Sequence, residues 1–552
     1  MTELAQATIQ RNSDLLAIRA PWESLWREAA QYCMPRRAPG IQGSVEVPGE
    51  DESRLFDTTA VQANMTLAAG QMSWMTPLEA AWFAIEPQNA AEPDEFKRWL
   101  SRGTAVLRNT MATSSFYEAI HEFYLDRGCF GTAAMYIGSS EKRVLKCEVW
   151  PVGTFVIDAD SDGRVDTVIR SFELDARQSV EKFGMDNVHP KVAERVAKNK
   201  DTRSKIRYLH AVLPRSEAER DGTKKDPENM PIASIYIDAD HVHVAELSGY
   251  NEFPVMVSRY LRWGSGMGSL YGWCPAFAAL ADVRQLNVLQ KMLDAQAEKA
   301  AFPAILAPDT LEGEIDANAH GITYYSADMG GAKPEEWLTQ GRFDIGLQRV
   351  QERQESIEKA FHVDLFKMFA GLEKQMTATE IMERSQEKLI QFSPTFAGLV
   401  SEVYNPLLER AFNLILRRGL VEPPPGFDPN NPVMPPMKVE YSSRIALALR
   451  AIPAIGYVRT LQRVGSVAGL KPDILDNFDF DAAERQTAMD DGLPAEYLIP
   501  QTEVVKIRKL REQAAQEQAA AEKAAMMAEG AGKLAGIKEG SPIDKLMSSG
   551  EL

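Results

Sequence analysis

Apolar residues recur every three to four positions along most of the first 130 residues of the chain. This period is typical of amphipathic helices, which bury one face and expose the other. Residues 36–54 interrupt it with Gly, Pro and charged residues and therefore predict a loop. The predicted helices are 3–35 with an interruption at Pro21, 58–75, 93–114 and 116–130, with a turn and short strand at 77–87.

From Gly131 onward the apolar residues alternate with polar ones, which is the period of a β-strand with one buried face. The alternation predicts strands joined by turns between Gly131 and Phe172. A short helix is expected at 176–183, followed by a charged stretch to Lys205. Further strands are predicted at 206–213, 233–238, 241–247 and 253–262.

A second helical region starts at Pro275, a residue that is favoured in the first turn of a helix. The apolar stripe of this helix comprises Leu280, Val283, Leu286, Leu289 and Leu293. The helix should end before Pro303, because the residue before a proline disfavours helical geometry. A short β-like insert from Phe302 and a second helical run from near Arg342 are expected to follow.

A longer helix is predicted from Thr377, because Thr377 and Glu380 have the spacing of a capping box. It should bend at Pro394 and Pro406 and stop at Gly419, ahead of three prolines. Residues 426–440 are interpreted as a linker, and 441–515 return to a helical period. Residues 512–552 are a low-complexity tail, expected to be helical at first.

Composition narrows the class of protein. At 552 residues the chain should form three or four regions. No apolar run approaches the roughly 18 residues that a membrane-spanning helix needs, and the polar N-terminus lacks the core of a signal peptide. We therefore expect no membrane insertion and a product that stays in the cytoplasm where it is made.

The net charge of −17 argues against a protein that wraps DNA around a broad basic face. A conduit for DNA, however, must avoid gripping the phosphate backbone, and an acidic wall repels phosphate. The charge is compatible with DNA passing through.

Four motifs were compared with known chemistry. Asp158, Asp160, Asp162 and Gly163 begin like a calcium loop, but Ile169 stands where that loop needs Glu, so a hairpin turn is predicted. The glycine-rich stretch 263–272 fits no nucleotide-binding motif.

His241 and His243 should share one face of a strand, but no third metal ligand is evident. The scattered cysteines are interpreted as isolated buried thiols: Cys33, Cys129, Cys147 and Cys274. No catalytic residue, cofactor site or metal site is predicted, so the chain is not expected to be an enzyme.

The segment 365–375 places three apolar side chains and two lysines around Gly371, between two helices. The residues of interest are Phe366, Lys367, Met368, Phe369 and Lys374. One interpretation is a hydrophobic interhelical turn buried in the core. The other is a mobile loop that projects into a channel, where the lysines meet phosphate.

Several fragments, in this order and spacing, are those of a known family. They are PWESLWREAAQYCMPRR (21–37), LFDTTAVQANMTLAAGQMSWMTPLEAAWFAIEP (55–87), FYEAIHEFYLDRGCFGTAAMYIG (116–138), DADSDGRVDTVIRSFELDARQ (158–178), SRYLRWGSGMGSLYGWCPAFAALADVRQLN (258–287) and MTATEIMERSQEKL (376–389). From roughly Arg11 to Leu510 the chain resembles the portal proteins of short-tailed (podovirus-type) bacteriophages, in the head-to-tail connector family.

The resemblance implies an α+β portal fold. Its parts would be an α/β wing (1–270), stem helix 1 (271–301), a small β-containing clip (302–341), stem helix 2 (342–364), a tunnel loop (365–375), a long broken helix with linker (376–438), a helical crown (439–511) and the low-complexity tail (512–552). Under this map the tunnel-loop residues named above would face the DNA channel.

The resemblance also implies a function. About twelve copies would form a closed ring at one capsid vertex, the channel for genome packaging, retention and ejection. The implied partners are the large terminase subunit, major capsid and scaffolding proteins, tail adaptor proteins and double-stranded DNA. The protein would belong to the virion after assembly in the bacterial cytoplasm. Two alternatives stay open, namely a head-tail adaptor or capsid-associated scaffold without a channel, and an enzyme.

Overall fold

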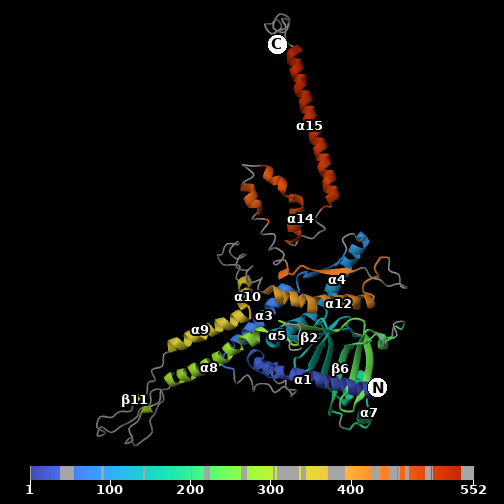
Figure 1. Ribbon diagram of the computed structural model, residues 1–552, viewed down its shortest axis with the longest axis vertical. Helices are drawn as coiled ribbons and strands as arrows, with labels where there is room; N and C mark the ends of the chain where they lie inside the picture. Colours follow the sequence, from blue (N-terminus) through green and yellow to red (C-terminus); the bar gives the residue numbers. More distant parts are fainter. Residues whose placement is uncertain are drawn as a thin grey trace. The chain divides into compact units, whose positions relative to one another are not determined.

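The computed structural model describes residues 2–37, 55–88, 93–140, 143–200, 202–216, 220, 224, 226–262, 270–301, 305–306, 335–336, 343–370, 392–425, 436–443, 445–446, 457, 460–466, 472–490, 499 and 501–535. The chain divides into two compact units, Met1–Leu449 and Arg450–Leu552 (Figure 1). The mixture of helices and sheets confirms the predicted α+β class.

The N-terminal helices form where the apolar period predicts them. They are α1 (Thr2–Cys33), α3 (Thr59–Met75), α4 (Asp94–Ala112) and α5 (Phe116–Phe130), with a 3-10 turn η1 (Pro35–Arg37) after α1. The expected interruption at Pro21 is absent, and α1 continues through it. Buried residues on both sides of the proline, among them Arg19 and Trp26, hold the two halves of this helix against the body and offset the missing N–H.

Two antiparallel sheets form the β part of the first unit. The three-stranded sheet has the order β3-β2-β9, built from β2 (Thr132–Gly138), β3 (Lys146–Trp150) and β9 (Val255–Arg259). The five-stranded sheet has the order β4-β5-β6-β7-β8. Its strands are β4 (Phe155–Ala159), β5 (Val165–Asp175), β6 (Lys205–Pro214), β7 (Ile232–Asp238) and β8 (His243–Tyr250), with a 3-10 turn η4 (Pro227–Asn229) before β7.

The aspartate motif is the turn of the β4–β5 hairpin, as predicted. Asp160 Oδ1 accepts the backbone N–H groups of Asp162 and Arg164 at 2.9 and 2.8 Å. This carboxylate therefore stabilises the turn itself, which explains why aspartate stands there without any metal.

Short helices cover one end of the five-stranded sheet. Helix α6 (Ala176–Phe183) has the predicted bounds, and a capping box between Asp175 and Gln178 opens it. Helix α7 (Pro190–Ala197) lies in the stretch that was interpreted only as charged. Its two turns bury Val192 alone, too little for the apolar period to reveal it.

His241 was predicted to lie on a strand, and this is wrong. It lies in a turn, Val242 adopts a positive φ of 53°, and β8 begins only at His243. The His241 ring hydrogen-bonds to Asp238 Oδ2 at 2.8 Å and stacks on His189 at 4.5 Å. The buried Asp238 carboxylate therefore pulls His241 out of the ladder.

The last part of the first unit returns to the N-terminal helices. A helical segment at 392–399 leads through a π-helical turn η5 (Val400–Tyr404) into α12 (Asn405–Arg417), which ends at Gly419 with a positive φ of 70°, as predicted. Strand β12 (Met437–Tyr441) pairs with β1 (Phe83–Pro87), although 426–440 was interpreted as a linker. Five residues beside a proline-rich stretch carry too weak an alternation to identify a strand that is completed only by a distant partner.

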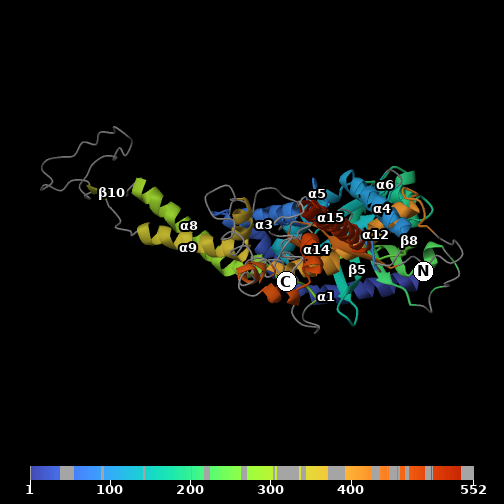
Figure 2. The ribbon, with the colours of Figure 1, turned by 90° about the horizontal axis from the view of Figure 1, so that it is seen from above.

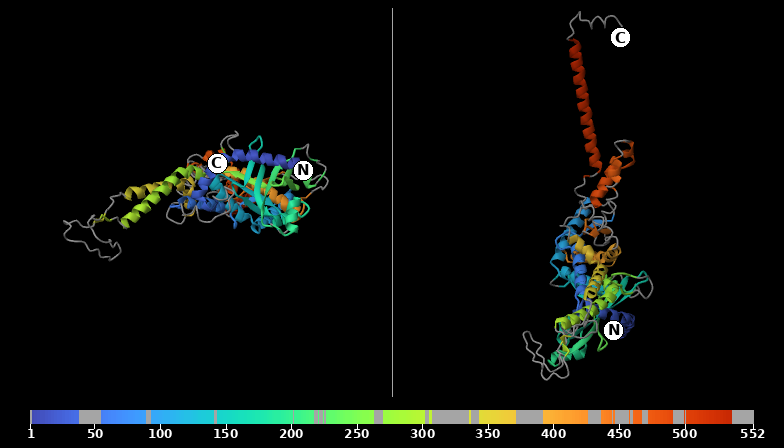
Figure 3. Two further views of the ribbon diagram at one scale, coloured as in Figure 1. Left: turned by 90° about the horizontal axis from the view of Figure 1, so that it is seen from below. Right: turned by 90° about the vertical axis from the view of Figure 1, so that its left-hand side faces the viewer.

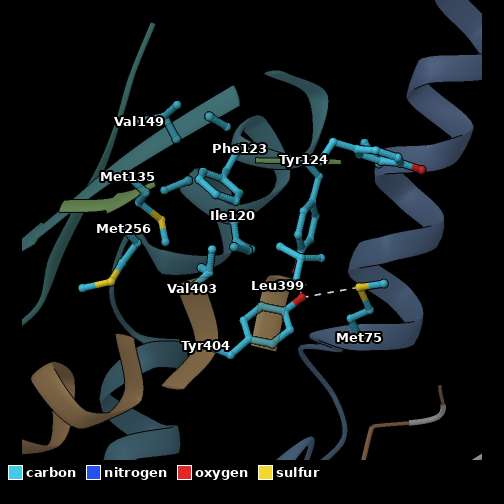
Figure 4. Packing of buried hydrophobic residues seen from close by; sticks show 14 of the residues in the cluster. Met75, Ile120, Phe123, Tyr124, Met135, Val149, Met256, Leu399, Val403 and Tyr404 are labelled. Atoms are coloured by element: carbon cyan, nitrogen blue, oxygen red, sulfur yellow. Dashed lines mark hydrogen bonds between the residues drawn. The ribbon is translucent and has the colours of Figure 1, made fainter. Parts of the chain in front are cut away.

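The main core encloses α5 between α3, the three-stranded sheet and η5. Figure 4 shows Ile120 and Phe123 of α5 packed among Met135, Met256 and Val403. Beside them, the Tyr124 and Tyr404 hydroxyls form a hydrogen bond of 2.6 Å, and the Tyr404 hydroxyl also donates to Met75 Sδ at 3.4 Å. These contacts join segments that are 280 or more residues apart.

The second unit contains a 3-10 helix η6 (Pro472–Asn477), α14 (Phe480–Asp490) and α15 (Gln501–Ala535). Helix α15 crosses the predicted boundary between crown and tail at 511/512, so one element spans both. The first part of the tail is helical, as expected. None of the helices in the described ranges is long and apolar enough to cross a membrane.

The Asp126 carboxylate in α5 provides a test of the core. It is fully buried, makes no hydrogen bond among the described residues, and has Arg37 Nε at 3.4 Å. Burial raises its pKa to about 7, against the opposing charge of Arg37. Because the folded state disfavours the ionised carboxylate, the protein should lose stability as the pH rises from about 3.8 through about 7.

Replacing Asp126 by Asn should remove this penalty. The gain in unfolding free energy over the unsubstituted chain should grow by roughly 2–3 kcal/mol between pH 5 and pH 8, measured as urea midpoints. The control is Glu118→Gln, an exposed residue in the first turn of the same helix, which should show no such growth. An equal effect of Asp126→Asn at both pH values would contradict the buried, raised carboxyl.

Candidate functional site: the helical hairpin and the segment after it

Helices α8 (Pro275–Ala301) and α9 (Phe343–Ala360) form an antiparallel pair that extends away from the sheets (Figures 1 and 2). The two helices correspond closely to the predicted stem helices. Only the first half of α8 is buried, down to Leu286. Beyond it, Val288 and Met292 are 52% and 58% exposed, and Leu347 of α9 is 57% exposed, so the outer half of the hairpin presents apolar residues to solvent.

Paired polar groups fix the register of the hairpin. Asp282 of α8 accepts from Arg353 Nη1 at 2.5 Å and from Ser356 Oγ at 2.7 Å, both on α9. Further out, the Leu293 side chain packs directly against Gly346. The Asp282 carboxylate, which accepts two hydrogen bonds, and the small residue Gly346 thus hold the two helices together at two points along the hairpin.

The base of the hairpin is anchored to the N-terminal helices. Arg284 forms a two-pronged ion pair with Glu28 of α1. Gln354 donates to Asp57 Oδ2 at 3.0 Å, and Asn287 accepts the backbone N–H of Phe56 at 2.8 Å. Polar bonds to two separate segments, α1 and the residues directly before α3, hold the base of the hairpin that projects in Figure 3.

Between the two helices lies the segment predicted as a clip, 302–341. The described part of it is the two-residue strand pair β10 (Ile305–Leu306) and β11 (Glu335–Glu336), which is antiparallel. The pair agrees with the expected β-like insert, and the rest of the segment lies outside the described residues.

The predicted tunnel loop begins as a helix. After α9 the chain turns at His362, with a positive φ of 55°, and α10 (Val363–Ala370) follows at once. The loop interpretation is therefore wrong for 365–370. Val363, Leu365 and Phe366 are buried, and this apolar face stabilises a third helix. The sequence suggested a loop here because Gly371 follows directly after it.

The five predicted site residues have different environments. Phe366 is 6% exposed and packs against Phe392 and the backbone of Gly70 in α3, so it belongs to the core of the subunit. Lys367 is exposed, and its Nζ reaches both carboxylate oxygens of Glu358 in α9 at 2.8 and 2.9 Å. Met368 and Phe369 lie in the last turn of α10, and Lys374 lies outside the described residues.

Lys367 is thus the predicted channel residue with a defined exposed position. Its pairing with Glu358 ties α10 to α9 on the surface. Exposed ion pairs of this kind contribute about 0–1 kcal/mol, so water or a phosphate can replace the carboxylate at little cost.

Glu402 is an important residue that the sequence reasoning missed. It lies in the π-helical turn, and its carboxylate accepts the backbone N–H of Arg259 at 2.7 Å and the Arg259 guanidinium at 2.7 and 3.0 Å. Arg259 in turn donates to the carbonyl of Gly163 at 2.7 Å. The network links the turn before α12, the end of β9 and the aspartate hairpin. The sequence gives no sign of it, because it depends on the burial of Arg259, which only the structure reveals.

Three of the four cysteines lie together, contrary to their interpretation as isolated thiols. Cys33, Cys129 and Cys274 are buried, and Cys274 Sγ donates to the Cys129 carbonyl at 3.3 Å. Burial raises the pKa of the Cys129 and Cys274 thiols well above its usual range, so these groups stay protonated and act as small apolar side chains. Within the described ranges no group of His, Cys, Asp or Glu is arranged to hold a metal ion.

A projecting hairpin with an apolar outer surface is suited to a protein that assembles with others. The chain belongs to the family of bacteriophage head to tail connecting proteins, whose family model matches residues 5–499. This structural family confirms both the resemblance found in the sequence and the expectation that the chain is not an enzyme.

Two curated relatives match the chain almost from end to end. The probable portal protein of Bordetella phage BPP-1 is 32% identical over 539 residues, which are 95% of this chain and 93% of the relative. The portal protein of Salmonella phage epsilon15 is 28% identical over 533 residues, which are 95% and 94% of the two chains.

The contact of Phe366 with Gly70 can be tested by mutation. A Cβ at position 70 would overlap the Phe366 ring, so Gly70→Ala must displace α10 from α3. We expect a loss of roughly 1–3 kcal/mol of unfolding free energy, as for other overpacked cores. Gly398→Ala is the matched control, since a Cβ there meets open space and alanine favours a helix. Equal effects of the two substitutions would contradict the packing of Phe366 on α3.

Proposed function

We propose that this chain is the portal subunit of a short-tailed bacteriophage. About twelve copies would close into a ring, as cyclic symmetry allows, at one vertex of the capsid. Double-stranded DNA would pass through the ring during packaging and ejection, and the ring would retain the genome between these events. The observation that carries the proposal is the match to two portal proteins over 95% of the chain.

The expected partners follow from the same function. The large terminase subunit would drive DNA through the ring, because this chain contains no nucleotide-binding motif of its own. Major capsid and scaffolding proteins would surround the ring during assembly in the host cytoplasm, and tail adaptor proteins would dock on it in the virion.

Physical features of the subunit support a channel. The net charge of −17 disfavours tight DNA binding. The α8–α9 hairpin mixes acidic and basic residues and exposes Val288, Met292 and Leu347, as expected of helices that pack between neighbouring copies. A head-tail adaptor without a channel is the second candidate, because the family description covers it equally well.

Electron microscopy of the purified protein separates the two candidates. Class averages viewed down the particle axis should show rings of about twelve subunits with an open centre. Compact monomers or dimers, or closed discs without a bore, would reject the portal and favour the adaptor.

The channel role of the lysines after α9 needs a packaging assay. Replacing Lys367 and Lys374 together by Ala should leave ring assembly intact and reduce the DNA packaged into, or retained by, the capsid. Loss of the Glu358 pair alone is tested by Glu358→Gln, which keeps both lysine charges and should package normally.

A matched control removes two exposed lysines of the α7 region, Lys191 and Lys198. This variant should package as the unsubstituted protein does. Normal packaging by the Lys367/Lys374 variant, or an equal defect in the Glu358→Gln variant, would reject the assignment of these lysines to the channel.

A further inference from the structure

A cavity of 480 Å³ lies where the three-stranded and five-stranded sheets meet. Strands β2, β3, β5, β6 and β7 and helix α6 contribute to its lining. Its size falls in the range of small-molecule sites. It is distant in the sequence from α8–α10 and has no part in the proposed channel.

Flat rings form much of the lining. Tyr136 stacks on Trp150 with a centroid distance of 5.6 Å and an interplanar angle of 7°. His210 stacks on Tyr236 at 4.0 Å and 6°, and Phe172 stands nearly perpendicular to Tyr236. Such surfaces favour a planar apolar body over a compact hydrated ion.

The cavity also has an excess of positive charge. Lys146 and Arg170 share the single carboxylate of Glu148, at 3.2 and 2.8 Å. Lys182 has its Nζ over the rings of Tyr236 and Phe172, at 4.2 and 4.6 Å, and pairs with no carboxylate in the described part of the chain. The lining thus carries three cations against two carboxylates, Glu148 and Glu173, and Glu173 pairs with Lys205 at 3.2 Å. Glu246 attracts Lys182 without forming an ion pair with it.

Neighbouring titratable groups respond to this charge. Burial, and then the charges of Lys182 and Arg170, hold the pKa of His210 well below its ordinary value, so its ring is neutral. Burial lowers the pKa of Lys182 to about 8, and Arg170 and Lys146 act in the same direction against Glu246 and Glu148. The buried Trp150 Nε1 and Arg170 Nε have no acceptor among the described residues. The lining therefore has hydrogen-bond donors that lack an acceptor within the described part of the chain, and more positive than negative charge.

We propose that this cavity binds a small carboxylic acid whose carboxylate is attached to a planar apolar ring. The carboxylate would pair with Lys182 and approach Arg170, and the ring would lie against the aromatic walls. A carboxylate supplies the acceptor oxygens and the negative charge that the lining lacks. Inorganic phosphate supplies charge but no apolar surface, so the walls select against it.

Isothermal titration calorimetry on the assembled protein tests the proposal, with benzoate, 2-naphthoate and inorganic phosphate as probes. Both aromatic acids should bind at pH 7, naphthoate more tightly because it buries more apolar area, and phosphate should not bind. Binding should weaken above about pH 8, as Lys182 loses its proton.

Variants locate the binding. Lys182→Gln should weaken the affinity for naphthoate at least about tenfold, the effect of losing a charged hydrogen bond. Lys182→Arg should retain most of the affinity, and Lys191→Gln, an exposed lysine of α7, should leave it unchanged. Circular dichroism spectra confirm that each variant is folded.

No heat of binding for either aromatic acid at millimolar concentration would overturn the proposal. Unchanged affinity in Lys182→Gln would place any binding elsewhere and overturn it too. Binding of phosphate without the aromatic acids would reject the chemical class. None of these outcomes bears on ring formation, so the portal function stands or falls separately.

Discussion

The first unit depends on helix α5, most of whose residues are buried, and within it on one buried arginine. Arg127 is fully buried, donates to Ser258 Oγ at 3.0 Å and to the Thr395 carbonyl at 3.2 Å, and lies over the Tyr260 ring at 4.5 Å. A buried guanidinium is costly unless its partners are in place. The three-stranded sheet and the segment before the π-helical turn must therefore meet α5 in one arrangement, which gives a unit of 449 residues a single packing.

The hairpin α8–α9 inherits its position from this core. Cys274, directly before α8, donates to a carbonyl of α5, and the first half of α8 packs in the same cluster as Phe123 and Phe130. The Asp282–Arg353 pair joins the two helices within this inner half, and the outer half leaves the core and exposes Val288, Met292 and Leu347. An inner half that is packed into the core and an outer half that is exposed to solvent are suited to a helical pair that contacts a partner at a distance from the body.

The sequence predicted those elements whose stabilising features all lie within one short segment of the chain. The helices at 116–130 and 176–183, the hairpin at the aspartates and the helix opened by Pro275 depend on period, caps and turn residues that lie within one segment. Three of the failures share one physical cause, since each depends on a partner far away in the chain. Strand β12 needs β1, Phe366 is buried only because Gly70 lets α3 approach, and Glu402 acquires its role from Arg259.

The same reasoning applies to the candidate site. Phe366 and Lys367 are neighbours in the sequence, yet one is in the core and the other is exposed, because α10 is a helix and its two faces meet different surroundings. The sequence fragments and their order along the chain were enough to identify the family, because many weak similarities add up to a specific match. They could not assign side chains to a channel wall, because in the proposed ring that wall would be formed only between copies. In the proposed ring, the residues that act on DNA would be set by symmetry as much as by the fold of one chain.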